Sequence, residues 1–248
     1  MPIDPSDALP GAGKRPFATT QWSVVLAAAE LPAEEGQRAL AQLCETYWYP
    51  LYAFVRGRVT SIPEAQDLTQ DFFTHLLERR AIEKAQPDRG RFRAFLLTCL
   101  KNFLNNEWQK DRRQKRGGSR SLLSLDFESA ESRLRLEPYH DVTPEKIFER
   151  RWVLTVLNQV LGKLQAQCAR DGKSQHFDQL KSCLTGQATA ADYDRAAQAL
   201  GITPAAAKQS TYRLKKQYRQ LFRDEIARTL ADEQDLDDEM GQMLENLA

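Results

Sequence analysis

Apolar side chains recur every three or four residues along most of this 248-residue chain, which is the spacing that gathers them on one face of an α-helix. The clearest run comprises Phe92, Phe95, Leu96, Cys99, Leu100, Phe103, Leu104 and Trp108. A second long run follows Pro144 and comprises Phe148, Trp152, Val153, Val156, Leu157, Val160, Leu161 and Leu164. No segment alternates between polar and apolar residues as a half-buried strand does, and no internal repeat is visible. The pattern predicts an all-α protein.

Shorter runs predict further helices. One contains Leu40, Leu43, Cys44 and Tyr47 and is interrupted at Pro50. Another begins near Pro63 and buries one side made of Ala65, Leu68, Phe72 and Leu76. A short helix is expected from about 176 to 184, before Gly186, and another around Trp22. Residues 1–16 contain four prolines and two glycines, so they are predicted to form a disordered arm.

The most specific local pattern lies between residues 189 and 219. Thr189 can cap a helix that runs to Leu200, and Gly201 supplies the freedom that a sharp exit needs. Thr203 followed by Pro204 is a second helix start. A helix, a short turn that contains glycine and a second helix make up a helix-turn-helix, which places its second helix in the major groove of DNA.

The segment 117–144 lacks sustained periodicity, so it is the candidate linker between two helical domains. We therefore expect a disordered arm at 1–16, a helical domain at 17–116, the acidic linker at 117–144, a helix-turn-helix domain at 145–223 and an acidic extension at 224–248.

Charge follows the same division, although the net charge is only +1. The segment 101–120 holds seven basic and two acidic residues, and 208–223 holds six basic residues and no acidic one. In contrast, 121–149 holds seven acidic residues against three basic, and 224–248 holds nine against one. Two cationic stretches held apart by acidic ones are typical of two nucleic-acid contact zones.

The four cysteines and three histidines are scattered, without the spacing of metal ligands or of a nucleophile and its base. We therefore predict that the protein has no metal site and no cofactor and that it is not an enzyme. Mean hydropathy is −0.58, no apolar run approaches the length of a membrane span and the N-terminus lacks a signal-peptide pattern, so a cytoplasmic protein without membrane contact is expected.

Three segments together resemble a bacterial sigma factor of the extracytoplasmic-function (ECF) type, in the sigma-70 family. PEAQDLTQDFFTHLL (63–77) resembles the segment that docks on RNA polymerase, GRFRAFLLTCLKNFLNNEWQKDRRQKR (90–116) resembles the promoter-melting and −10 helix, and residues 193–219 resemble the −35 motif. The resemblance covers about 37–116 and 145–220. It implies two helical domains, and core RNA polymerase and promoter DNA as partners.

The resemblance also implies roles for individual residues. The residues expected to meet polymerase are Asp67, Gln70 and Asp71. Those expected at the −10 element are Phe95, Cys99, Asn102, Asn105, Asn106, Arg112, Arg113 and Lys115, with Asn102 receiving a flipped base between Phe95 and Cys99. Those expected at the −35 element are Thr203, Lys208, Gln209, Arg213, Lys215, Lys216 and Arg219.

The docking patch reads Glu64-Ala65-Gln66-Asp67, one carboxylate fewer than the family's common Asp-Ala-Glu-Asp. Thr69 lies between Asp67 and Asp71, where a phosphate could restore the missing negative charge. This position suggests control by a Ser/Thr kinase. A separate anti-sigma protein covering the docking surfaces is a rival means of control, and a third is the acidic extension folding back on a cationic stretch.

Three other functions compete with a sigma factor. A helix-turn-helix regulator that does not replace a sigma factor accounts for 193–219 but leaves 63–77 and 92–116 unexplained. An enzyme would need converging acid, base and nucleophile groups, and Glu107 with Asp111 is better explained as surface charge balance. A helical adaptor for a kinase leaves both cationic stretches without a role.

Overall fold

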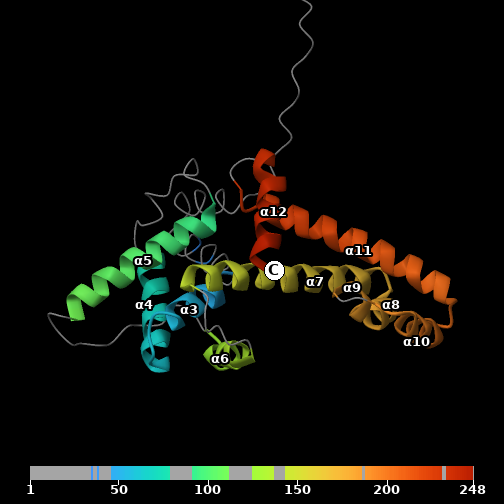
Figure 1. Cartoon of the computed structure of the whole chain (residues 1–248), viewed down its shortest axis with the longest axis horizontal. Coiled ribbons are helices and arrows are strands. Elements are labelled where there is room, and N and C mark those ends of the chain that lie inside the picture. The colour runs from blue at the N-terminus through green and yellow to red at the C-terminus, as the bar shows by residue number, and fades with distance from the viewer. Residues whose placement is uncertain are drawn as a thin grey trace, which may run out of the picture.

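The computed structural model describes residues 46–78, 91–111, 125–136, 143–185, 188–230 and 233–247, together with Glu35 and Arg38. Within these ranges the chain forms α-helices and one 3-10 turn and contains no strand, which confirms the all-α prediction. Figure 1 shows an elongated arrangement in which the helices flank one long central helix. The predicted arm, the helix around Trp22 and most of the run before Tyr47 lie outside the described residues.

The first core is built around helix α3 (Trp48–Arg56). Pro50 lies in the first turn of α3, where its missing N–H costs no helical hydrogen bond. Seven of the nine residues of α3 are buried, so this short helix is surrounded on most sides. Helices α4 (Ile62–Glu78) and α5 (Phe92–Asp111) pack beside it with Ala65, Phe72, Phe73, Leu76, Phe92, Leu96, Leu100 and Leu104 buried.

Helix α7 (Pro144–Arg170) is the central rod of the molecule (Figure 1). The side chain of its cap Thr143 accepts a hydrogen bond from the Lys146 N–H, and Pro144 fills the first position, as the sequence predicts. Its 27 residues span about 40 Å. The amino-terminal half, with Phe148 and Trp152 fully buried, completes the first core.

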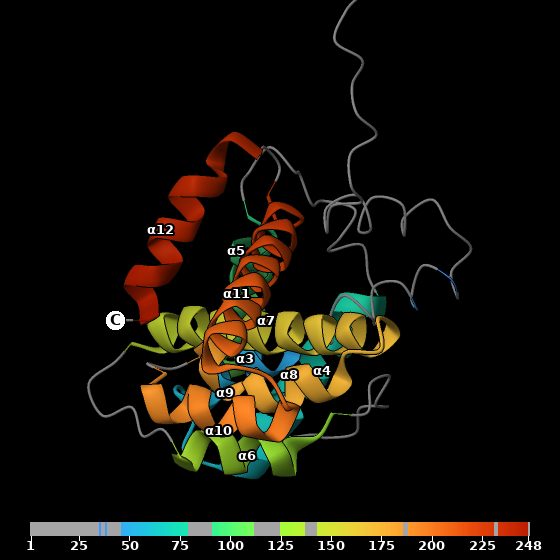
Figure 2. The same ribbon diagram turned by 90° about the vertical axis from the view of Figure 1, so that its right-hand side faces the viewer.

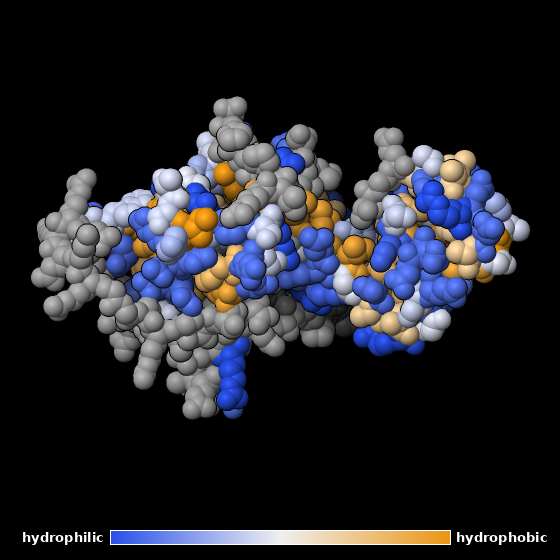
Figure 3. Space-filling view, turned by 90° about the horizontal axis from the view of Figure 1, so that it is seen from below, coloured by the Kyte–Doolittle hydropathy of each residue, from blue (hydrophilic) through white to orange (hydrophobic). Residues whose placement is uncertain are grey.

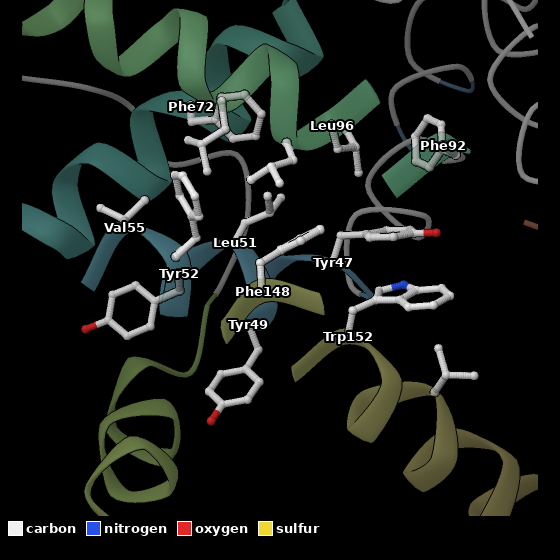
Figure 4. Packing of buried hydrophobic residues seen from close by; sticks show 14 of the residues in the cluster. Tyr47, Tyr49, Leu51, Tyr52, Val55, Phe72, Phe92, Leu96, Phe148 and Trp152 are labelled. Carbon is white, nitrogen blue, oxygen red and sulfur yellow. The ribbon is translucent and has the colours of Figure 1, made fainter. Parts of the chain in front are cut away.

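The aromatic residues of the first core join three segments that are distant in sequence. Tyr47 lies between Phe92 and Trp152, with ring centroids 5.4 and 6.4 Å away (Figure 4). The Arg93 guanidinium lies 4.4 Å above the Trp152 ring and pairs with Glu149 at 2.7 Å. Helix α7 is therefore fixed to α5 by stacking and charge as well as by apolar burial.

The predicted linker contains a helix, α6 (Phe127–Leu136), which the weak periodicity of this segment did not predict. Phe127 of α6 contacts Trp48 and Tyr52 of α3. Glu131 accepts hydrogen bonds from the Tyr52 hydroxyl at 2.7 Å and from Arg56 at 2.8 Å. Burial and then Glu131 raise the pKa of Tyr52, so its hydroxyl stays a proton donor to the carboxylate.

A second core gathers around the carboxyl half of α7. It joins Leu164 and Cys168 to α8 (Ser174–Leu180), α9 (Ser182–Thr185), α10 (Ala190–Leu200) and the first half of α11 (Pro204–Ala227). The single helix predicted near 176–184 is thus divided at Lys181. Figure 3 shows the underside of the molecule, where hydrophilic residues cover much of the end formed by this core.

The chain then returns to the first core. Ile226 and Leu230 at the end of α11, and Leu236 and Met243 of α12 (Leu236–Leu247), are buried there, after a 3-10 turn η2 at Glu233–Asp235. The two cores therefore share α7 and α11, each of which contributes residues to both. The domain boundaries given above stay a prediction.

Candidate nucleic-acid interface

Helix α5 presents a polar stripe on the face opposite its buried residues. Its exposed members recur at helical spacing and are Thr98, Asn102, Asn105, Asn106 and Gln109. The buried members of the same helix hold it against α4 and α7, so the stripe lies on a rigid support. Side-chain amides both donate and accept hydrogen bonds, which suits them to the edges of unpaired bases.

Phe95, Cys99 and Asn102 follow one another at spacings of four and three residues, so they lie on one side of α5. Phe95 and Cys99 are half-buried and pack against the first core, whereas Asn102 is exposed. Burial raises the pKa of the Cys99 thiol to about 11, so the thiol stays neutral and is not a nucleophile at neutral pH. The structure thus places the three predicted pocket residues together.

A group of charged residues beside this stripe was not predicted from the sequence. Glu145 at the start of α7 pairs with Lys101 of α5 and with Arg58, each at 2.9 Å. Both cations also lie near the Phe54 ring, at 5.8 Å for Lys101 and 4.9 Å for Arg58. The hydrogen bond from Lys101 is the main cause that holds the pKa of the Glu145 carboxyl below its ordinary value. Only the tertiary fold brings Glu145 to these two cations.

The other cationic residues predicted for this zone, Arg112, Arg113 and Lys115, lie outside the described residues.

The predicted polymerase-docking face lies on α4. Asp67 is exposed, and Gln70 and Asp71 are partly exposed, so all three reach the surface. Thr69 does not. It is 1% exposed, and its hydroxyl donates a 2.7 Å hydrogen bond to the Ala65 carbonyl. The prediction that Thr69 is a surface residue open to a kinase is therefore wrong for this fold, because the position belongs to the buried side that α4 shares with Phe72 and Phe73.

The predicted caps of helices α10 and α11 are present. Thr189 and Asp192 form a capping box, and the Thr203 hydroxyl accepts a hydrogen bond from the Ala206 N–H. Gly201 ends α10 with a φ of 64°, a left-handed conformation that favours glycine. Residues 201–203 connect α10 to α11. Ala197 and Ala207 are buried in the second core between the two helices.

The opposite face of α11 is cationic and exposed. Of the residues predicted to contact DNA, Thr203, Lys208, Gln209, Arg213, Lys216 and Arg219 are exposed and Lys215 is half-buried. Lys208 also lies 5.6 Å from the Tyr193 ring of α10. Sequence reasoning missed Tyr212, whose side chain is 68% exposed in the middle of this face. A large aromatic residue among cations, one position from the buried Thr211, is the signal that could have identified it.

Among the described residues, no three His, Cys, Asp or Glu side chains gather as ligands of a metal ion. None of the described helices is both long and apolar enough to span a membrane.

Part of the chain matches a known protein family. Residues 43–114 match the family model of sigma-70 region 2, whereas no curated protein and no solved structure matches the chain. The matched segment comprises α3, α4 and α5, the helices that carry the docking face and the amide stripe. Residues 43–114 are therefore similar to region 2 of sigma-70 factors, over the helices that carry the predicted docking face and the amide stripe.

Proposed function

We propose that this protein is an ECF-type sigma factor that binds core RNA polymerase, recognises a promoter and helps to melt it. The observation that carries the proposal is the coincidence of the region 2 match with an exposed amide stripe on α5. A sigma factor acts with polymerase in the cytoplasm and uses no catalytic residue or cofactor of its own, so the proposal requires neither.

For the −10 element, Asn102 would receive an unpaired base between Phe95 and Cys99. Asn105 and Asn106, on the same exposed face, would contact neighbouring nucleotides. The cations Arg112, Arg113 and Lys115 would hold the backbone phosphates. The half-buried state of Phe95 and Cys99 supports this role, because each packs on the core and still reaches the surface.

For the −35 element, α10 and α11 would act as a helix-turn-helix with α11 in the major groove. The caps at Thr189 and Thr203 and the left-handed Gly201 support this assignment. The DNA-facing side chains would be Thr203, Lys208, Gln209, Arg213, Lys215, Lys216 and Arg219, and we add Tyr212. A phenol ring can contact a thymine methyl group while its hydroxyl hydrogen-bonds to a base edge or phosphate.

Asp67, Gln70 and Asp71 would bind polymerase from the exposed side of α4. An anti-sigma protein that covers this face would prevent that binding, and we favour such a regulator over phosphorylation of Thr69. The burial of Thr69 leaves no room for a phosphate unless α4 moves. Kinase control would therefore need another residue or an opened form of α4.

Run-off transcription with purified core polymerase on a pool of genomic promoters tests the proposal. A sigma factor makes the core enzyme start at specific sites, whereas a helix-turn-helix regulator without sigma activity does not.

Asn102→Ala should lower open-complex formation about tenfold, because a captured base loses its polar partner. Asn158→Ala is the matched control, since Asn158 is an exposed asparagine of α7 outside both faces. Equal activity of the two variants would contradict the role of Asn102.

A further inference from the structure

Helix α12 returns from the end of α11 to the first core (Figure 2). Its inward face carries Leu236, Glu239, Met240 and Met243, which recur at helical spacing. Leu236 is 7% exposed and Met243 is 1% exposed, whereas Glu239 between them is fully buried. A buried carboxylate in the middle of an apolar face needs cationic partners, because an unpaired one would be strongly disfavoured.

Both partners of Glu239 lie where α5 begins, with Arg91 directly before the helix and Arg93 in its first turn. The Glu239 carboxylate pairs with Arg91 at 2.5 Å, and it also pairs with Arg93. A third contact lies nearby, where Asp237 pairs with Arg223 of α11 at 2.6 Å. Carboxylates of α12 thus meet guanidinium groups of both helices that the proposed function assigns to DNA.

The two arginines of α5 depend on α12 to different degrees. Arg93 is buried and also pairs with Glu149 and stacks on Trp152, so it keeps these partners when α12 is absent. The Arg91 side chain is 32% exposed, so it faces solvent at the edge of this contact. The core is therefore able to release α12 without leaving a buried cation unpaired.

We propose that α12 is an internal competitor of DNA. In the docked state Glu239 and Asp237 occupy Arg91 and Arg223, the positions that phosphate oxygens would otherwise take. Release of α12 frees these cations and raises the affinity for DNA. This regulatory role rests on the proposed function, whereas the docking contact does not.

Glu239→Gln in the full chain tests the proposal, because it removes the charge and keeps the shape. We expect amide exchange across residues 236–247 to become about tenfold faster. Affinity for a fluorescein-labelled mixed-sequence duplex with an unpaired bubble should rise, and the slope of log K against log salt should steepen by about 1.8, because Arg91 and Arg223 each gain a phosphate. Glu245→Gln is the matched control, since Glu245 is an exposed carboxylate of the same helix.

Two further variants separate release from folding and from charge. Met243→Ala keeps every charge and loosens only the apolar contact, so it should shift exchange and DNA affinity in the same direction as Glu239→Gln. Arg91→Gln should also speed exchange of α12, but it should steepen the salt slope by only about 0.9 and raise DNA affinity less than Glu239→Gln does, because Arg223 is then the one cation of this pair that is freed. Circular dichroism of each variant verifies that the remaining helices are intact.

Unchanged exchange in Glu239→Gln would overturn the docking contact, and released α12 with unchanged DNA affinity would overturn the competition. Co-elution of the wild-type chain with core polymerase is measured in parallel. Failure there would reject the proposed function, whereas the exchange measurement decides the docking of α12 in either case.

Discussion

At the scale of single residues, the surroundings of a side chain decide its chemistry. Thr69 lies next to Asp67 and Asp71 in sequence, but the turn of α4 carries it to the buried side while Asp67 points outward. Cys99 and Asn102 are three residues apart on α5, and only Asn102 is exposed. Residue type alone therefore does not identify the residues that are open to a partner.

We expect Thr69→Glu to lower the free energy of unfolding by about 3 kcal/mol, because a carboxylate would be buried without a cation. Thr69→Val, which keeps the shape, should cost about 1 kcal/mol or less. Urea denaturation of both variants measures the difference. Two results together would contradict this expectation: Thr69→Glu being as stable as Thr69→Val, and Thr69→Glu binding core polymerase better than Thr69→Ala. They would show that α4 opens and that a kinase can act through Thr69.

The raised pKa of Cys99 predicts slow alkylation. A pKa of about 11 in place of the ordinary 9.0 makes the thiolate fraction at pH 8 roughly 100-fold smaller than in the unfolded chain. Reaction with iodoacetamide, followed by mass spectrometry of the peptide that contains Cys99, should show this ratio between folded and urea-unfolded protein. The rate should rise about tenfold for each pH unit up to the pKa. Equal rates in both states would mean that the thiol is exposed.

At the scale of elements, helix ends determine where α10 and α11 lie. Their limits are set by local chemistry, namely the hydroxyl caps at Thr189 and Thr203, the first-turn Pro204 and the left-handed Gly201. Because these signals act within a few residues, the sequence predicts both ends of the turn. The division between α8 and α9 at Lys181 has no comparable signal, and it was not predicted.

Gly201→Ala should lower the free energy of unfolding by about 1–2 kcal/mol, because a side chain disfavours the left-handed conformation. Gly162→Ala is the control. Gly162 lies inside α7, a Cβ there meets no atom within 4 Å, and alanine favours the helix by about 1 kcal/mol over glycine. Urea denaturation should thus shift in opposite directions for the two variants. A shift in the same direction would show that the turn does not depend on the conformation of Gly201.

At the scale of the whole molecule, α7 belongs to both cores and joins them without a break. Tyr218 and Leu221 pack against both cores, and the Tyr218 hydroxyl donates to the Leu157 carbonyl at 3.1 Å. Loss of either core therefore removes support from the same helix.

We expect the two cores to unfold in one transition. Trp48, Trp108 and Trp152 belong to the first core and no tryptophan follows Trp152 in the sequence, so fluorescence of these three reports on the first core, whereas circular dichroism at 222 nm reports on every helix. The urea curves from the two signals should coincide. A second step seen only by circular dichroism would show that the second core is independent of the first.

The sequence by itself determined the helical fold class, the starts of α7 and α11, both limits of α10, and the polar stripe of α5. These features follow from periodicity and from capping within a few residues, which are local properties. The cationic face of α11 was also evident, although Tyr212 within it was missed.

The tertiary structure alone decided which helices share a core and which charges meet. The contact of Glu145 with Lys101 and the docking of Glu239 on Arg91 and Arg93 join residues whose pairing leaves no periodic signal. Packing fills space with side chains from several helices at once. Burial and charge pairing therefore depend on neighbours far away in sequence, which no local pattern specifies.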